Sequence, residues 1–96
     1  MAAFWSPRPN VVQSDDGVTI EVLGRTGIRY SERERSCFVD SEVLAIAAVA
    51  VWPSGIRRWE GPHEHEPLSD EDRERILANI VAAFASQDWG LEIIRR

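Results

Sequence analysis

The sequence predicts an α+β domain in which a mainly antiparallel sheet of about five or six strands packs against one long C-terminal helix. Three observations predict this class. Short runs of alternating apolar and polar residues, typical of half-buried strands, fill the first half of the chain. Their connections are too short for helical crossovers, so neighbouring strands should be antiparallel. One apolar stripe at helical spacing follows, and the sheet is the only large surface that it can cover.

The size and composition fit a single domain. The chain has 96 residues, of which 44% are hydrophobic and 28% charged, which argues against wholesale disorder. We expect residues 10–96 to form the domain and residues 1–9, around Pro7 and Pro9, to form an extended arm. The sequence has neither a membrane-spanning apolar run nor the pattern of a secretion signal, and its single Cys37 cannot form an internal disulfide. We therefore expect a cytoplasmic protein.

Turn residues predict where the first strands begin and end. Asp15-Asp16-Gly17 should form a tight hairpin turn, because an Asp-Gly pair readily adopts the positive φ angles that such turns require. A second turn is expected at Gly24–Gly27, and a polar hairpin tip at Ser31–Arg35. The strands predicted around these turns include Val11–Ser14, Val18–Leu23, Ile28–Tyr30 and Cys37–Val39.

The segment Ser41–Trp52 allows two interpretations. Leu44–Ala48 favours a helix by propensity. Val49 and Val51 favour a buried strand instead. We predict a strand, because Pro53 ends the run and a helix here would have to bury all of its faces.

The long helix is predicted from its cap and its apolar stripe. Ser69 is a favourable N-cap, and Asp72 lies at the position that completes a capping box. Gly90 should end the helix, and Leu91–Ile94 should form a last strand. Ser54 is expected to cap a shorter helical turn upstream. The predicted stripe consists of Ile76, Leu77, Ile80, Val81 and Phe84.

Acidic residues are concentrated in one segment. The chain has a formal net charge of −5. Residues 60–72 contain six carboxylates and no arginine, so their local charge is −6 and the rest of the chain carries +1. Such a segment suits a basic protein partner, whereas a solvated loop and helix start is the alternative interpretation. The six residues are Glu60, Glu64, Glu66, Asp70, Glu71 and Asp72.

No catalytic constellation stands out, so we predict that the chain is not an enzyme and uses no cofactor. Cys37 with His63 or His65 has the ingredients of a thiol dyad, but no supporting motif surrounds these residues. Cys37 lies in a predicted strand, where a cysteine is usually a small core residue. Gly24–Gly27 lacks the length and the lysine of a phosphate-binding loop.

His63 and His65 form a minor candidate metal site. In an extended chain the two imidazoles would point the same way and could share a zinc or nickel ion. A catalytic site needs a third protein ligand, and no spacing rule selects either Glu60 or Asp70 for that role. An exposed polar loop between two prolines is the favoured interpretation.

A nucleic-acid partner is the weaker alternative to a protein partner. Arginines interleaved with aromatic residues could contact phosphates and stack on bases. The sequence pI near 4.9 and the absence of a basic stripe make nucleic acid an unlikely partner. The residues in question are Arg25, Arg29, Arg57 and Arg58 with Tyr30, Trp52 and Trp59.

Three short stretches carry a likeness to a known family: Gly24–Tyr30 (GRTGIRY), Val39–Ala45 (VDSEVLA) and Ser54–Glu60 (SGIRRWE). With the capped helix and the last strand, they resemble a family of small predicted immunity proteins of bacterial polymorphic toxin systems. The resemblance covers about residues 10–95. Residues 46–50 depart from it, because they are richer in alanine than the family's turn at this place.

The resemblance implies a cytoplasmic antidote that neutralises a cognate toxin domain by binding it, and it brings no catalytic residues. An acidic segment could occupy the basic active site of a nuclease toxin. Self-association as a homodimer through an exposed edge strand, such as Leu91–Ile94, is a further alternative. Trp59 is a candidate anchor for a partner, because tryptophan is enriched at binding hot spots. Packing of Trp59 in the core is the favoured alternative. The predicted partner-binding residues are Trp59, Glu60, Glu64, Glu66, Asp70 and Glu71.

Overall fold

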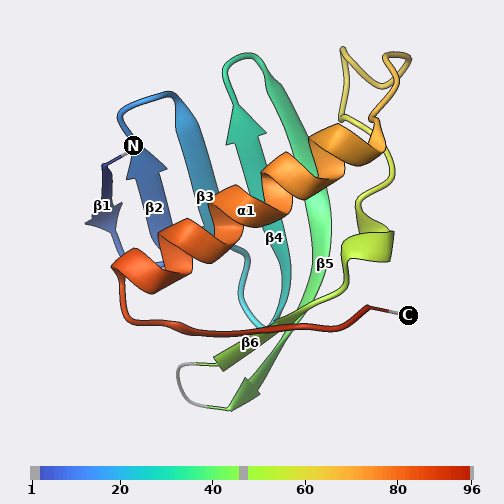
Figure 1. Cartoon of the computed structure of the whole chain (residues 1–96). Helices are drawn as coiled ribbons and strands as arrows, with labels where there is room; N and C mark the ends of the chain where they lie inside the picture. Colours follow the sequence, from blue (N-terminus) through green and yellow to red (C-terminus); the bar gives the residue numbers. More distant parts are fainter. Residues whose placement is uncertain (1–2, 46–47, 96) are drawn as a thin grey trace.

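The computed structural model describes residues 3–45 and 48–95. Within these residues a seven-stranded sheet follows the order of the chain from β1 to β7, and one helix crosses its face (Figure 1). The predicted α+β class is confirmed, with one or two strands more than expected. The elements are β1 (Phe4–Arg8), β2 (Val11–Ser14), β3 (Val18–Val22), β4 (Thr26–Glu32), β5 (Arg35–Ala45), β6 (Ala48–Val51), the 3-10 turn η1 (Pro53–Gly55), α1 (Asp70–Ser86) and β7 (Gly90–Ile93).

The first six strands form an antiparallel meander, as predicted. β7 instead pairs with β6 in parallel, because α1 lies between these two strands and returns the chain to the end from which β6 starts. The turns expected between β2 and β3 and between β4 and β5 are present. Gly17 has a φ of 92°, which explains why the first of these turns contains glycine.

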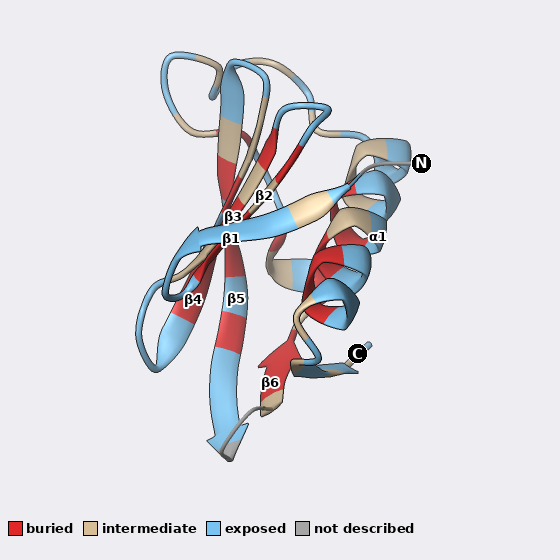
Figure 2. Ribbon diagram, turned by 90° about the vertical axis from the view of Figure 1, so that its left-hand side faces the viewer, coloured by how far each residue is buried: buried red, intermediate tan, exposed pale blue. Residues whose placement is uncertain are grey.

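The core lies between α1 and the inner face of the sheet, where the buried residues gather in Figure 2. Val81 was predicted to belong to the helix stripe, but this prediction is wrong because the residue is 41% exposed. Ala83 is fully buried in the stripe instead. Across the sheet, one row of side chains in register faces the helix: Val12, Ile20, Tyr30 and Cys37.

The ends of α1 agree with the sequence only in part. The capping box is confirmed, because the Asp72 N–H donates to Ser69 Oγ at 3.1 Å and the Ser69 N–H donates to Asp72 Oδ2 at 3.0 Å. Gly90 does not end the helix. Asp88 adopts a φ of 59° and reverses the chain, so Gly90 is already the first residue of β7. Ser54 caps no helix, because η1 begins at Pro53 and has no side-chain cap.

Two segments differ from their predicted form. Phe4–Arg8, expected within an extended arm, pairs with β2 as an edge strand, and Phe4 packs against the core. The described residues of Ser41–Trp52 are mainly in strand, as predicted, but they belong to two strands. β5 continues to Ala45 and β6 begins at Ala48, so the chain reverses between them; residues 46–47 lie outside the described residues. In the antiparallel pairing of β5 with β6, Val49 and Val51 of β6 enter the core. Buried and exposed residues still alternate along β5 from Cys37 to Glu42.

Candidate functional site

The acidic segment 60–72 runs from the outer side of the β4–β5 hairpin to the first turn of α1. Its start is fixed to β5, because the Glu60 N–H donates to the carbonyl oxygen of Ser36 at 2.8 Å. The Ser36 hydroxyl donates to Glu60 Oε1 at 3.1 Å, and Arg29 Nη2 lies 3.5 Å from Glu60 Oε2. The carboxylate of Glu60 is therefore used within the molecule.

The middle of the segment is held by Glu66. Its carboxylate contacts the guanidinium of Arg35 and the Nδ1 atom of His63. The hydrogen bond from His63, together with the charge of Arg35, lowers the pKa of Glu66 below its ordinary value. This carboxylate connects the loop to the start of β5 and has little capacity left for a partner.

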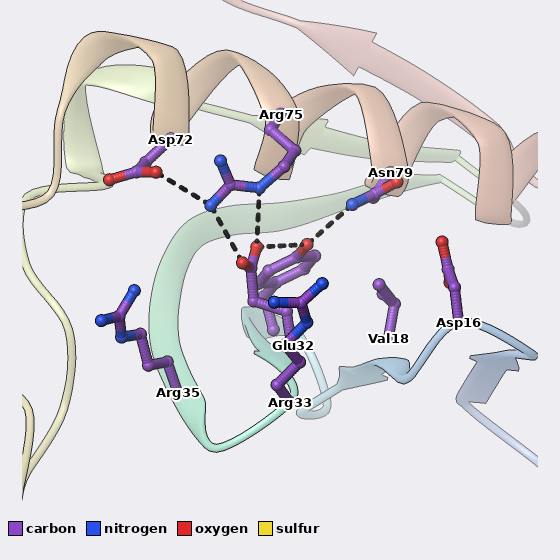
Figure 3. A pocket seen from close by; sticks show the side chains of 9 residues that line it. Asp16, Val18, Glu32, Arg33, Arg35, Asp72, Arg75 and Asn79 are labelled. Carbon is purple, nitrogen blue, oxygen red and sulfur yellow. Dashed lines mark hydrogen bonds and ion pairs between the residues drawn. The ribbon is translucent and has the colours of Figure 1, made fainter.

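A polar network joins the start of α1 to β4 (Figure 3). Arg75 Nη2 lies 2.9 Å from Asp72 Oδ1, and the guanidinium of Arg75 also donates to both carboxylate oxygens of Glu32, at 3.2 and 2.9 Å. The Tyr30 hydroxyl donates to Glu32 Oε1 at 2.9 Å and accepts from Asn79 Nδ2 at 2.8 Å. Within this network each of these side chains has a polar partner, so the network stabilises the contact between helix and sheet.

The ionisation of this network follows from its contacts. The backbone N–H of Ser69 and the guanidinium of Arg75 lower the pKa of Asp72. Burial raises the pKa of Tyr30 well above its ordinary value, so its hydroxyl stays protonated at neutral pH.

A cleft of about 390 Å³ borders the network. Three carboxylates and three arginines line it, so it has no net formal charge and no general preference for an anion or a cation. The six residues are Asp16, Glu32, Asp72, Arg33, Arg35 and Arg75.

The six carboxylates of the segment fall into two groups. The inner carboxylates, Glu60, Glu66 and Asp72, are half-buried and paired: the first two contact the β4–β5 hairpin, and Asp72 contacts its own helix start. The outer carboxylates, Glu64, Asp70 and Glu71, face solvent. Asp70 contacts Arg73 at 2.5 Å with its side chain 99% exposed, and the described residues contain no ion-pair partner for the other two.

Trp59 cannot act as a surface anchor, which corrects its place among the predicted binding residues. It is 1% exposed and packs in the core, with the guanidinium of Arg35 lying 5.7 Å from its ring centre. Tyr30 is also fully buried. Neither ring is available to stack on bases, which removes two of the aromatic residues considered for nucleic-acid binding.

The histidines and the cysteine show no assembled reactive site. His63 contacts Glu66, and among residues 3–45 and 48–95 no group of three or more His, Cys, Asp and Glu side chains could hold a metal ion. Cys37 is fully buried, and burial raises the pKa of its thiol to about 12. A thiol with this pKa is almost entirely protonated at neutral pH and is a poor nucleophile.

The sequence did not predict the ion pairs that Arg35 and Glu32 make with distant residues. Arg35 and Glu32 lie in a hairpin that reads as a solvated tip, and their partners Glu66 and Arg75 are 31 and 43 residues away. One local signal was available, because Arg75 follows Asp72 by three residues, the spacing at which helical side chains meet.

The fold and the site define a small α+β domain with an acidic segment that is partly paired within the molecule and partly presented to solvent. A family model described as Immunity protein 74 matches residues 19–94, and the chain belongs to this family of immunity proteins. The match begins in β3 and includes the acidic segment, α1 and β7. No curated protein and no solved structure matches the chain. The described residues contain no helix long and apolar enough to cross a membrane.

Proposed function

We propose that this chain neutralises a cognate bacterial toxin by binding it directly, without catalysis, in the cytoplasm of the cell that produces both. The observation that carries this proposal is the match to the Immunity protein 74 family over residues 19–94.

The outer carboxylates Glu64, Asp70 and Glu71 are the proposed contacts for a basic surface of the toxin. Their solvent exposure leaves them available to a partner. The inner carboxylates fix the loop to the hairpin, so the outer ones are presented from a held backbone. Charges of this kind accelerate association through long-range attraction, and salt weakens the effect.

The direct test begins with the genes beside this one, where we expect a large secreted protein whose C-terminal domain is the toxin. We expect expression of that domain to stop bacterial growth, and co-expression of this chain to restore growth with formation of a stable complex of the two proteins. Failure to bind that domain or to restore growth, with a correctly folded chain, would refute the proposal.

The role of the outer carboxylates is tested with the triple variant Glu64→Gln, Asp70→Asn, Glu71→Gln. We expect the association rate constant with the toxin domain to fall about tenfold at low salt, and the difference from wild type to shrink at high salt.

The matched control neutralises three exposed carboxylates elsewhere, Glu42→Gln, Glu74→Gln and Asp88→Asn. It changes the net charge by the same amount, and asparagine tolerates the positive φ at position 88. Equal effects of the two triple variants would mean that net charge alone governs association.

A further inference from the structure

β7 forms one edge of the sheet, so one side of its main chain has no neighbouring strand among the described residues. The Ile94 N–H donates to the carbonyl oxygen of Val51 at 2.9 Å. Alternate residues of a strand direct their N–H and C=O groups to the same side, so those of Leu91 and Ile93 point away from β6. In the part of the chain that the structure describes, β7 pairs with no strand other than β6.

The opposite edge of the sheet is protected against pairing. In β1, the pairing with β2 shifts register between Trp5 and Arg8, and Pro7 in this irregular stretch interrupts the regular strand geometry. Proline and irregular register are common ways of blocking an exposed edge. β7 contains no proline and keeps a regular register with β6 from Gly90 to Ile93. The two edges therefore differ in their capacity to accept another strand.

The side chains of β7 specify what an added strand would meet. Leu91 packs against the core, and Ile93, on the same face, is 37% exposed. Glu92 points to the opposite face and is exposed. An added strand would find apolar surface on one face and a carboxylate on the other.

We propose that β7 accepts an extended segment of the toxin as an eighth strand, with an arginine or lysine of that segment opposite Glu92. This inference rests on the proposed function and adds to it the place and the manner of binding. Main-chain hydrogen bonds would supply affinity, and the cation opposite Glu92 would supply specificity.

A second copy of this chain fits the edge less well. Within Gly90–Ile93, the symmetric antiparallel pair in which Leu91 bonds to Ile93 of the other copy places Glu92 directly opposite Glu92. Like charges opposite each other destabilise such a pair, and each copy carries a net charge of −5. The charge pattern therefore favours a basic segment from a different protein.

The test removes one outward donor with Ile93→Pro and measures affinity for the toxin domain that the co-expression test above identifies. We expect the Kd to rise about tenfold or more, because the variant loses a hydrogen bond and places a proline ring at the pairing edge. Ile93→Ala is the matched control, because it shortens the same side chain but keeps the N–H. We expect a smaller change in Kd, of about threefold or less.

Two further variants separate pairing from folding. Ser6→Pro removes an outward N–H from β1, the other edge strand. The Ala3 carbonyl oxygen accepts from the Asp15 N–H, so residue 3 faces β2 and residues 4 and 6 face away from β2. We expect its Kd to equal that of wild type. Glu92→Arg keeps the whole main chain, and we expect its Kd to rise several-fold. Thermal melts of all four variants show which of them fold normally.

Hydrogen exchange of the wild-type complex gives an independent reading. We expect the amides of Leu91 and Ile93 to become protected when the toxin domain binds. If the toxin domain binds and neither these amides nor the affinities of Ile93→Pro and Glu92→Arg change, the edge proposal is overturned and the proposed function stands. If the toxin domain does not bind wild type, both are overturned. Protection without toxin, with a dimer in light scattering, would make a second copy the occupant and would also overturn the proposal.

Discussion

The two ends of α1 are held to the sheet by different interactions. At its start, Arg75 contacts Glu32 and Asn79 contacts Tyr30, while Asp72 pairs with Arg75 on the helix itself. At its end the contacts are apolar. The rings of Phe84 and Trp89 meet edge to face with centroids 5.4 Å apart, beside a groove that is also lined by Val22 and Val49.

This difference affects how each end responds to change. Apolar burial contributes according to the area removed from water and tolerates modest rearrangement. A buried polar network contributes only while its partners are in place, because a donor or acceptor left without a partner costs free energy. We therefore expect large losses from truncation at the apolar end and losses that are not additive at the polar end.

The largest expected effect is at the apolar end. Phe84→Ala should lower the free energy of unfolding by about 3–5 kcal/mol, because it removes a fully buried ring and leaves a cavity. Urea denaturation measures the change. Val81→Ala on the same helix is the control and should cost less than about 1 kcal/mol, because Val81 is 41% exposed. Similar losses in the two variants would show that Phe84 is not the main apolar contact of this end.

The next effect is at the polar end. Tyr30→Phe should lower the free energy of unfolding by about 1–2 kcal/mol, because the hydroxyl joins Asn79 to Glu32. The double variant Tyr30→Phe, Asn79→Ala should lose less than the sum of the two single variants. Strict additivity in urea denaturation would show that the two residues act independently.

The helix cap should have a smaller effect. Ser69→Ala should cost about 1 kcal/mol, because the Asp72 N–H loses its acceptor. Ser54→Ala is the control and should change stability by less than about 0.5 kcal/mol, because Ser54 caps no helix. A loss at position 54 equal to that at position 69 would contradict this assignment of the caps.

Acid sensitivity should be the smallest effect and should be found at the polar end. The pKa of Asp72 is below its ordinary value of 3.8, so its ionised form stabilises the fold above that pH. This contribution to stability is lost as the pH falls from about 3.8 toward the lower pKa that Asp72 has in the folded protein. In urea midpoints measured from pH 7 to pH 3, Asp72→Asn should give a shallower acid decline than wild type. Parallel curves would show that Asp72 does not contribute to it.

The apolar end was more predictable from sequence than the polar end. Helical spacing identified Ile76, Ile80 and Phe84, because burial of a stripe depends on local periodicity. The partners of Glu66 and Arg75 could not be identified, because ion pairs between distant segments depend on the tertiary arrangement. The edge strand β1 was missed for a related reason, since Pro7 is typical of both an arm and a protected edge.

The acidic segment lies at the polar end, and its division into inner and outer carboxylates is the central claim. The most direct measurement compares the urea midpoints of two triple variants that carry the same change in charge. Glu60→Gln, Glu66→Gln, Asp72→Asn removes the inner set, and Glu64→Gln, Asp70→Asn, Glu71→Gln removes the outer set.

We predict a clear fall in the midpoint for the inner set, because contacts to the hairpin and the helix cap are lost. For the outer set we predict a smaller fall, because these side chains face solvent and only Asp70 and Glu71 add a modest interaction with the helix start. Equal midpoints for the two variants, or a larger loss in the outer set, would contradict the division.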